Sequence, residues 1–384
     1  MGHVRHLYVH LPFCAHRCGY CDFVTVVGRR GEHAAYVDAL LAELGLERRV
    51  LAEPLETVFL GGGTPTFTEG RELERLLDGL PLAGAAEVTV EANPETVTPE
   101  LARMLRGAGV NRVSVGAQSF RPPLLAVLER RATGDDVRRA VHTLRDAGFD
   151  NISLDLLYGI PGQSAADLDR DLADALALEP EHLSCYELEA KPGTRFTHAH
   201  GAELTRQAEA METYFERVVD TLTDAGYRWY ETANFCLGPG RSAGQDLRAR
   251  HNLGYWLGRD YLGLGVGAVS TIAGERRRNR PSLATYVGTL ERGGVPAREV
   301  EPLDAGTRAR ERLLLRLRLD EPLATPGLEG VLDREALARL RAGGLLEVSA
   351  KGQGADGRGE ELRLTRRGRF LGGAVTGELM LDPA

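Results

Sequence analysis

The chain has 384 residues, of which 43% are hydrophobic and 27% are charged, a composition typical of a globular protein with a large core. Its formal net charge of −8 argues against a nucleic-acid partner, because phosphate contacts require a basic face. No apolar run reaches the roughly 18 residues that a membrane span requires, and the first residues show no signal-peptide pattern. We therefore expect a cytoplasmic protein.

Strand-like and helix-like segments alternate through the first 190 residues. Short apolar runs predict buried strands at 6–13, 55–63, 86–94, 111–119, 151–160 and 182–190. Amphipathic stretches lie between them; Val137, Val141 and Leu144, for example, fall on one helical face. Such repeats predict an α/β fold with a parallel sheet, whose functional loops follow the carboxyl ends of the strands. The number of repeats fits a partial (β/α)₆ barrel better than a closed eight-stranded one.

A C-x₃-C-x₂-C triplet, Cys14, Cys18 and Cys21, directly follows the first predicted strand. Three thiolates on one short loop can hold three irons of a [4Fe–4S] cluster, which leaves the fourth iron open to another ligand. Structural zinc is the alternative, with His10 or His16 near enough to supply a fourth ligand. The preceding strand, and an aromatic residue immediately before the last cysteine, favour the cluster. Cys185 and Cys236 stand singly in apolar surroundings and are expected in the core.

Glycine and polar residues follow several of the predicted strands. The run Gly61–Gly63 precedes Thr64, and glycine allows a ligand to approach the backbone closely. Other polar residues at strand ends are Glu91, Gln118 and Asp155, and a carboxylate such as Asp155 can accept hydrogen bonds from ribose hydroxyls. Arg130 is suited to pairing with a ligand carboxylate, although the neighbouring Arg131 competes for this role.

The rest of the chain is less regular. We expect residues 1–230 to form the barrel, 231–295 an additional lobe covering its open side, and 300–384 a C-terminal domain. In that last segment, a helix followed by two strands around a polar turn at 351–360 resembles a winged helix. Without a strongly basic face, such a domain is better suited to covering a cavity or contacting a partner than to reading DNA.

Together, these motifs resemble the radical S-adenosylmethionine (SAM) superfamily. In that family the open iron chelates the methionine end of SAM, and an electron from the cluster cleaves the C5′–S bond to give a 5′-deoxyadenosyl radical. The resemblance implies that Tyr20 packs beside the adenine, that the glycine run binds the methionyl amino group and that Arg130 pairs with the SAM carboxylate. The implied SAM-contacting residues are Tyr8, Tyr20, Gly62, Gly63, Thr64, Glu91, Gln118, Arg130 and Asp155. No catalytic residue is assigned beyond the cluster.

Within the superfamily, the chain from Tyr8 to about residue 320 resembles the oxygen-independent coproporphyrinogen III oxidase-like group. This group contains oxidases, heme chaperones and methylases. Phe23 stands where the oxidases carry a fourth cysteine, and the chain lacks their N-terminal extension. The run HNLGYW, residues 251–256, is instead similar to a signature of the chaperone branch.

That similarity implies a heme site in which His251 ligates the iron, Tyr255 and Trp256 pack against the macrocycle and Asn252 orients the loop. The alternative is that the histidine and the aromatic residues are buried between lobe and barrel. A basic stretch could pair with heme propionates, although we favour a solvated charge run. It comprises Arg276, Arg277, Arg278 and Arg280.

The resemblance implies a heme chaperone that carries a [4Fe–4S] cluster and SAM and transfers heme to acceptor hemoproteins, among them membrane-bound respiratory enzymes. Flavodoxin or ferredoxin would serve as electron donor. A coproporphyrinogen III dehydrogenase and a radical SAM methylase are the alternatives. Two positions depart from the family pattern: Ala132 and Val269 stand where relatives often have histidine. The first makes the Arg130 assignment less secure, and the second removes one candidate heme or substrate ligand.

Overall fold

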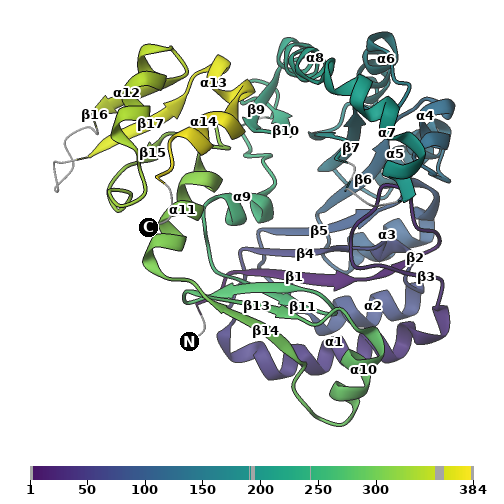
Figure 1. Ribbon diagram of the computed structural model, residues 1–384. Coiled ribbons are helices and arrows are strands. Elements are labelled where there is room, and N and C mark those ends of the chain that lie inside the picture. The colour runs from purple at the N-terminus through teal and green to yellow at the C-terminus, as the bar shows by residue number, and fades with distance from the viewer. Residues whose placement is uncertain (1–2, 190, 192–194, 243, 351–358, 382–384) are drawn as a thin grey trace.

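The computed structural model describes residues 3–189, 191, 195–242, 244–350 and 359–381. Six parallel strands lie side by side in chain order and form a partial barrel (Figure 1). They are β1 (His6–Leu11), β4 (Thr57–Gly62), β5 (Glu87–Ala92), β6 (Arg112–Gln118), β7 (Ile152–Tyr158) and β8 (His182–Glu187). The predicted α/β fold and all six strands are thus confirmed.

Helices cover the outer face of this sheet (Figure 1). They are α1 (His33–Glu47), α2 (Gly70–Gly79), α3 (Pro99–Gly107), α4 (Pro122–Val127), α5 (Gly134–Asp146), α6 (Ala165–Leu176), α7 (Arg195–Ala208) and α8 (Met211–Asp224). Four single-turn 3₁₀ helices accompany them: η1 (Arg30–Glu32), η2 (Arg48–Val50), η3 (Pro65–Phe67) and η4 (Pro94–Thr96). Gly109 and Gly148, which follow α3 and α5, have φ of 94° and 87°, the left-handed conformation that ends a helix and favours glycine.

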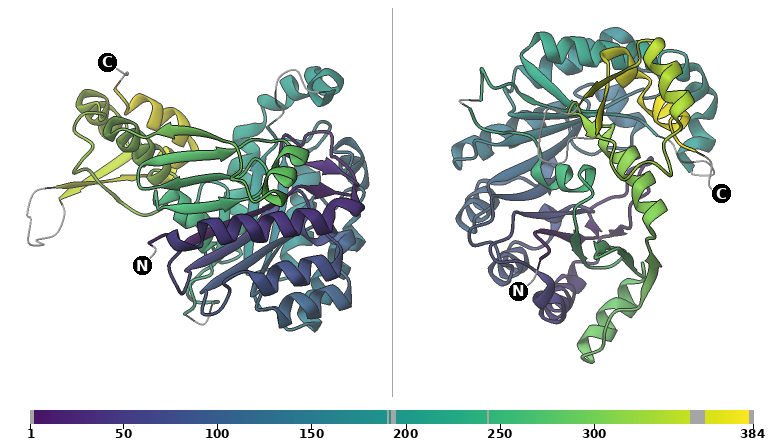
Figure 2. Two further views of the ribbon diagram at one scale, coloured as in Figure 1. Left: turned by 90° about the horizontal axis from the view of Figure 1, so that it is seen from below. Right: turned by 90° about the vertical axis from the view of Figure 1, so that its left-hand side faces the viewer.

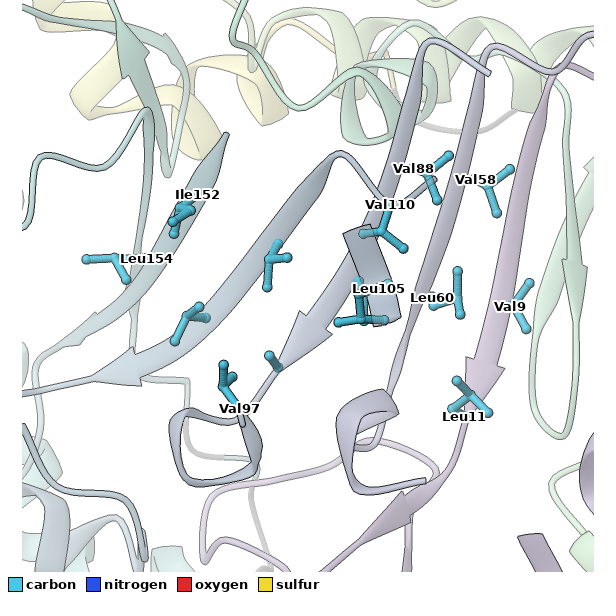
Figure 3. Packing of buried hydrophobic residues seen from close by; sticks show 14 of the residues in the cluster. Val9, Leu11, Val58, Leu60, Val88, Val97, Leu105, Val110, Ile152 and Leu154 are labelled. Carbon is cyan, nitrogen blue, oxygen red and sulfur yellow. The ribbon is translucent and has the colours of Figure 1, made fainter. Parts of the chain in front are cut away.

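The core lies between the strands and these helices (Figure 3). Val9, Leu60, Val88 and Leu154 come from four different strands and are fully or almost fully buried. Parallel strands with one face against helices and the other inside a barrel read as nearly continuous apolar runs, which explains why the sequence signal was clear. Cys185 and Cys236 are also buried, as expected.

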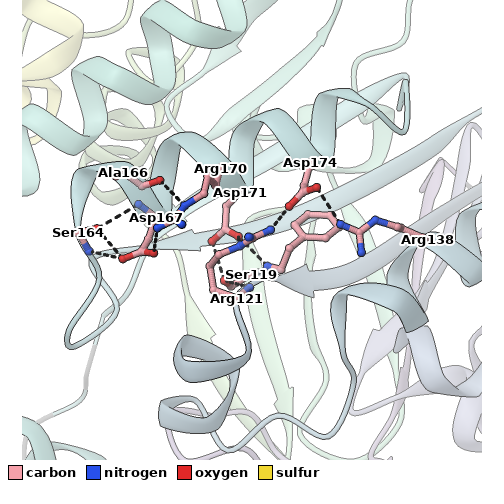
Figure 4. A network of polar contacts seen from close by, with 10 residues as sticks. Ser119, Arg121, Arg138, Ser164, Ala166, Asp167, Arg170, Asp171 and Asp174 are labelled. Atoms are coloured by element: carbon pink, nitrogen blue, oxygen red, sulfur yellow. Dashed lines mark hydrogen bonds and ion pairs between the residues drawn. The ribbon is translucent and has the colours of Figure 1, made fainter.

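A polar network joins the loop after β6 to α6 (Figure 4). The Asp171 carboxylate is buried and accepts hydrogen bonds from Ser119 Oγ at 2.6 Å and from the Phe120 amide at 2.8 Å. Arg121 donates to Asp171 at 3.2 Å and also contacts Asp174. Because a buried carboxylate requires such partners, the network fixes the loop that leaves the carboxyl end of β6.

The sheet continues beyond the barrel on both edges and has 12 strands in all. The hairpin β9 (Tyr227–Glu231) and β10 (Asn234–Leu237) extends the sheet from β8. Strand β11 (Tyr261–Leu264) pairs in parallel with β1, and three antiparallel strands follow it. These are β12 (Val269–Ile272), β13 (Glu275–Asn279) and β14 (Arg298–Pro302). Much of the segment 231–295 therefore prolongs the barrel sheet, whereas we expected it to cover the open side.

Two helices accompany this extension. Helix α10 (Leu283–Glu291) packs against α1. Helix α9 (Arg250–Trp256) lies at the amino-terminal ends of the barrel strands, since the Glu87 carboxylate at the start of β5 accepts from the backbone amides of Arg250 and His251 at 2.9 and 3.0 Å. A carboxylate at a helix N-terminus satisfies free amide groups there and so anchors α9 to the strand.

The C-terminal unit follows α11 (Ala305–Arg316) and has a small core of its own. Its sheet consists of β15 (Leu323–Ala324), β17 (Glu360–Leu364) and β16 (Leu346–Ala350), in that order. Its helices are α12 (Arg334–Ala342), α13 (Arg366–Phe370) and α14 (Gly372–Glu378). Most of the polar turn expected at 351–360 lies outside the described residues. Figure 2 shows this unit projecting from one side of the molecule.

Within the described part of the chain, we find no helix with the length and apolarity needed to cross a membrane.

Candidate cofactor-binding site

A cavity of about 450 Å³ opens at the carboxyl ends of the barrel strands. Its volume falls in the range of small-molecule sites, roughly 300–1,000 Å³. All but one of the residues expected to hold the cluster or SAM line it: Cys14, Cys18, Tyr20, Cys21, Gly62, Gly63, Thr64, Glu91, Gln118, Arg130 and Asp155. The fold thus brings together residues that span more than 140 positions of the sequence.

A short parallel pair, β2 (Phe13–Cys14) and β3 (Val26–Val27), holds the cysteine loop. The Gly28 amide donates to the Cys14 carbonyl at 2.8 Å, and the Cys21 amide donates to the Cys18 carbonyl at 3.2 Å. Burial raises the pKa of the Cys14 and Cys21 thiols. The thiolate forms therefore need a strongly cationic partner, and ligated iron would meet that need.

Two of the cysteine thiols are joined by a chain of polar side chains. Thr64 Oγ1 donates to Cys14 Sγ at 3.5 Å and accepts from Asn93 Nδ2 at 3.0 Å. Asn93 Oδ1 in turn accepts from Arg130 Nη2 at 3.0 Å, and Arg130 Nη1 donates to Cys18 Sγ at 3.7 Å. Donors around sulfur stabilise thiolates and tune a bound cluster. Thr64 is therefore a hydrogen-bond partner of one of the three clustered cysteines.

The same network distinguishes between the two neighbouring arginines. Arg130 also donates to the Gly116 carbonyl at 2.7 Å and lines the cavity, whereas Arg131 is not among the lining residues. The Arg130 guanidinium therefore has a fixed position beside the cysteine loop, even though position 132 is alanine.

Of the two histidines considered as a fourth zinc ligand, His10 is not free to bind a metal ion. Both ring nitrogens of His10 are engaged, Nδ1 lying 3.0 Å from the Tyr8 hydroxyl and Nε2 lying 2.8 Å from the Val24 carbonyl. Among the described residues, no three His, Cys, Asp or Glu side chains gather closely enough to hold a single metal ion. His16, the other candidate, lines the same cavity as the three thiols, and three thiols on one short loop suit a polynuclear cluster.

Two half-buried carboxylates face the cavity, Glu91 from β5 and Asp155 from β7. Glu91 Oε2, at the end of β5, accepts from the Gly62 amide at 3.0 Å. Desolvation, reinforced by nearby Asp155, raises the pKa of Glu91 to about 7. Burial also raises the pKa of Asp155, although Ser114 donates to both of its oxygens at 3.2 Å. Their free lone pairs are available to a ligand that donates hydrogen bonds.

Unusual backbone conformations place Gln118 and the two glycines in the cavity wall. Gln118 has φ of 64° at a register shift in β6, an unusual conformation for a residue other than glycine. Gly62 has φ of 110°, and a Cβ at Gly63 would lie 2.6 Å from the Pro12 backbone. The two glycines therefore let the loop after β4 pack closely against the start of the cysteine loop. Any other residue at position 63 would force the Pro12 backbone to move.

Tyr8 is the one expected SAM residue that does not line the cavity. It lies deeper in the barrel, where its ring stacks on Phe59 with 6.1 Å between centroids and its hydroxyl contacts His10. Contact between Tyr8 and SAM therefore stays a prediction; the side chain is half-buried and contacts His10 and Phe59.

The HNLGYW segment forms most of α9 and differs from the heme site we expected. His251 is 1% exposed; its Nδ1 lies 2.7 Å from Thr57 Oγ1 and its Nε2 lies 2.8 Å from the Tyr255 hydroxyl. Burial lowers its pKa to about 3, so the ring is neutral. With both nitrogens engaged, His251 is not presented to heme iron, and its surroundings match the alternative of a buried histidine.

The other residues of this segment contact different neighbours. The edge of the Tyr255 ring faces Tyr261, with 4.6 Å between centroids, while Arg318 lies 4.5 Å above the Trp256 ring. Asn252 is half-buried, and none of the residues 251–256 lines the 450 Å³ cavity. The segment therefore contributes packing between barrel, sheet extension and C-terminal unit, and it does not form one heme face.

The basic stretch on β13 is paired with acidic neighbours. Arg276 donates to Glu311 at 2.7 and 2.8 Å and to Glu301 at 3.3 Å, and Arg277 donates to Glu275 at 2.5 Å. These contacts pair two of the four arginines, Arg276 and Arg277, with carboxylates, and they fit the solvated charge run that we favoured.

Comparison with known proteins gives the family. Residues 8–175 match the Radical SAM superfamily. A protein named heme chaperone HemW from Mycobacterium tuberculosis is 37% identical over 97% of this chain and 94% of its own length. Another of that name, from Bacillus subtilis, is 32% identical over 98% of this chain and 99% of its own length. The chain belongs to the HemW family of radical SAM proteins.

A solved structure supports the fold of this HemW-family chain. Coproporphyrinogen III oxidase (HemN) from Escherichia coli aligns with a TM-score of 0.79 at 23% identity, over 98% of this chain and 90% of the oxidase. At this identity the likeness concerns the fold alone. Radical SAM membership implies a [4Fe–4S] cluster and SAM. Bound together they supply reductive cleavage of SAM, and the thiols of Cys14, Cys18 and Cys21 are the groups that would hold the cluster.

Several residues of this cavity in the HemW-family chain were missed from the sequence. Asn93 connects Thr64 to Arg130, Ser114 donates to Asp155, and Tyr186 forms part of the cavity wall. Each of them lies in or just after a barrel strand, so the strand-end rule that found Glu91 would also have indicated Asn93 and Tyr186. Ser114 lies within β6 and becomes recognisable only through its contact with Asp155.

Proposed function

We propose that this chain binds heme and transfers it to acceptor hemoproteins, with a [4Fe–4S] cluster and SAM as resident cofactors. The observation that carries the proposal is the 37% identity, over 97% of the chain, to a protein named heme chaperone. Such coverage includes the C-terminal region as well as the barrel, and a shared barrel alone would say little about function.

The cavity supplies a second argument, against an oxidase. Phe23 stands where the oxidase branch has a fourth cysteine; its side chain is 65% exposed and lines the cavity beside Cys21. An exposed aromatic ring cannot replace the chemistry of a thiol. It does offer an apolar contact at the rim, where Arg17 and Lys191 lie among acidic residues; Lys191 is 3.3 Å from Glu189 and 3.9 Å from Asp22.

We propose flavodoxin or ferredoxin as the electron donor. We further propose that the acceptors include membrane-bound respiratory enzymes and that the protein acts in the cytoplasm. SAM would lie against the half-buried carboxylates of Glu91 and Asp155, with Gln118 and Arg130 on the other side of the ligand.

The test offers two compounds separately to chain that has been reconstituted with its cluster under anaerobic conditions. With heme, we expect a saturable change in the Soret absorption at one heme per chain. With coproporphyrinogen III, SAM and reductant, we expect no protoporphyrinogen. Robust decarboxylation would overturn the chaperone assignment in favour of the dehydrogenase, and a methylated product with a second SAM consumed would favour the methylase.

A further inference from the structure

A second cavity, of about 610 Å³, lies between the barrel and the C-terminal unit. Its barrel side comes from Tyr158 on β7, Tyr186 on β8 and Phe215 on α8, and its other side comes from α11, α13 and α14. Tyr186, Glu187 and Glu189 also line the cluster cavity, so the two cavities share one wall. None of the established features of the chain uses this second cavity.

The walls of this cavity expose both polar and apolar side chains, and the apolar ones include several aromatic rings. Tyr186 is 40% exposed and Leu314 is 43% exposed, although both lie inside the concave space between the two parts. Phe215 contacts both Tyr158 and Phe370, with ring centroids 6.2 and 5.2 Å apart. Aromatic and aliphatic walls of this kind favour a large flat apolar ligand.

Two arginines on the C-terminal side add positive charge. Arg318 lies 4.5 Å above Trp256 and donates to Glu231 at 2.7 Å. Arg369 lies 3.6 Å above Trp229. The chain contains only two tryptophans, and each therefore positions an arginine that lines this cavity.

Arg369 has a hydrogen-bond donor that the described residues leave without an acceptor. Its Nη2 atom is buried and has no hydrogen-bond partner among the described residues. Burial lowers the pKa of its guanidinium to about 10. A buried guanidinium nitrogen without a hydrogen-bond partner is costly, and a carboxylate entering the cavity would supply a charge-assisted bond to it.

We propose that this cavity is the heme site of the protein, with the ring against Tyr186, Phe215, Leu314 and Phe370 and a propionate on Arg369. The proposal rests on the heme chaperone function proposed above and places that function in the chain. Glu187 and Glu189 lie on the barrel wall, so the propionates turn away from that wall, toward the arginines. The heme would then lie on the other side of the wall that both cavities share, formed by Tyr186, Glu187 and Glu189.

The assignment also gives HNLGYW an indirect role. Trp256 supports Arg318, and Arg318 lines the cavity, whereas His251 lies in the barrel interior. The segment would thus position a heme-binding residue without touching heme.

Heme titration of the full-length, cluster-reconstituted chain, followed by Soret absorption, tests the proposal with two matched pairs of variants. Arg369→Gln removes the charge in the cavity, and Arg367→Gln removes an exposed charge from the same helix. Gly373→Leu fills the cavity from α14, while Gly377→Leu, one turn further on, lies outside the lining. A Cβ at either glycine meets no atom within 4 Å, so both variants should fold.

We expect the heme dissociation constant to rise about ten-fold or more in Arg369→Gln and Gly373→Leu, and to stay within two-fold of the wild type in both controls. The heme-free Arg369→Gln variant should unfold at a temperature no lower than the wild type, because the substitution removes a buried nitrogen that has no hydrogen-bond partner. Wild-type affinity in both cavity variants would overturn the site and leave the chaperone function standing. Weaker binding in Arg369→Gln with a lower unfolding temperature, and wild-type affinity in Gly373→Leu, would make the arginine structural and also overturn the site. If the wild-type chain itself binds no heme, the proposed function fails.

Discussion

At the scale of single residues, the environment of the cluster cysteines is set by neutral donors on one side and a guanidinium on the other. Thr64 donates to Cys14, and Arg130 donates to Cys18, with Asn93 between them. Hydrogen bonds to sulfur lower electron density on a cluster and so raise its reduction potential. Thr64 is therefore expected to act on the cluster without being one of its ligands.

Replacing this hydroxyl tests that role. Thr64→Val keeps the shape of the side chain but removes its donor, so the cluster should still assemble with unchanged iron content and a more negative midpoint potential. A redox titration followed by electron paramagnetic resonance measures the shift. Thr66→Val is the matched control, since Thr66 bonds to Thr96 at 2.6 Å and not to a cysteine. Equal potentials in the wild type and in Thr64→Val would contradict the role.

Glu91 predicts a pH dependence. Its pKa is raised to about 7 in the folded chain, above the value near 4.5 expected when unfolded. Between these values the folded state holds a proton that the unfolded state has lost, so the free energy of unfolding falls as pH rises through this window. The full effect is about 3 kcal/mol.

Glu91→Gln should abolish this part of the pH dependence. In SAM-free chain, chemical denaturation at pH 5 and pH 8 should show the variant gaining up to about 3 kcal/mol relative to the wild type at the higher pH. The exposed Glu95→Gln provides the control, with an offset that does not change between the two pH values. Parallel stability curves for Glu91→Gln and the wild type would show that the carboxylate titrates normally.

Much of the first cavity could be predicted residue by residue because parallel strands bring their carboxyl ends together. Glu91, Gln118 and Asp155 follow from that rule alone. The surroundings of Tyr8 and His251 could not be predicted in this way, because a polar residue on a strand or helix can point into a barrel as easily as toward a ligand. Their partners, Phe59 and Thr57, lie far away in sequence.

At the scale of elements, α9 packs against the amino-terminal ends of the barrel strands β4 and β5. His251 bridges β4 through Thr57 and its own helix through Tyr255, and its ring stacks on Phe59 with centroids 5.1 Å apart. The Glu87 carboxylate holds the N-terminus of the helix. This combination predicts a stabilising role for His251.

His251→Ala should lower the free energy of unfolding by about 2–4 kcal/mol, because it leaves a cavity and takes the hydrogen-bond partner of the Tyr255 hydroxyl, while Thr57 keeps its contact with His6 at 2.9 Å. The folded fraction should bind heme with wild-type affinity. Urea denaturation and heme titration of one preparation measure both quantities, and the half-buried Asn252→Ala on the same helix should change neither by much. A variant of normal stability that has lost heme binding would restore His251 as a ligand.

The six barrel strands were predictable from sequence, whereas the sheet extension was not. Strand β13 reads ERRRN and carries no apolar signal; its place comes from pairing with β12 and β14 and from ion pairs with Glu301 and Glu311. Propensity rules look for buried faces, and an exposed antiparallel strand stabilised by its neighbours offers none.

At the scale of the whole molecule, the C-terminal unit is joined to the barrel by charge pairs and an aromatic cluster. Arg228 donates twice to Asp320, at 2.7 and 2.8 Å, and Arg318 donates to Glu231. Phe370 contacts both Phe215 and Trp229, with centroids 5.2 and 5.3 Å apart. The same contacts enclose the second cavity, so docking of this unit and heme affinity should change together.

Phe370→Ala should therefore weaken the junction. We expect a loss of about 2 kcal/mol in stability and faster cleavage near residues 317–322 in limited proteolysis, because fewer contacts hold the unit against the barrel. Heme affinity should fall in the same variant. The adjacent Leu371→Ala changes a residue that is 39% exposed and serves as the control. Unchanged proteolysis and heme affinity would place the junction elsewhere.

The central claim is direct delivery of heme, and a transfer assay with a scavenger tests it most directly. Heme-loaded chain is mixed with a heme-depleted membrane-bound respiratory enzyme in the presence of excess apomyoglobin, which captures free heme. We predict that the respiratory enzyme regains activity from heme-loaded chain but not from the same amount of free heme. If apomyoglobin prevents the respiratory enzyme from regaining activity with heme-loaded chain as well as with free heme, the account is contradicted.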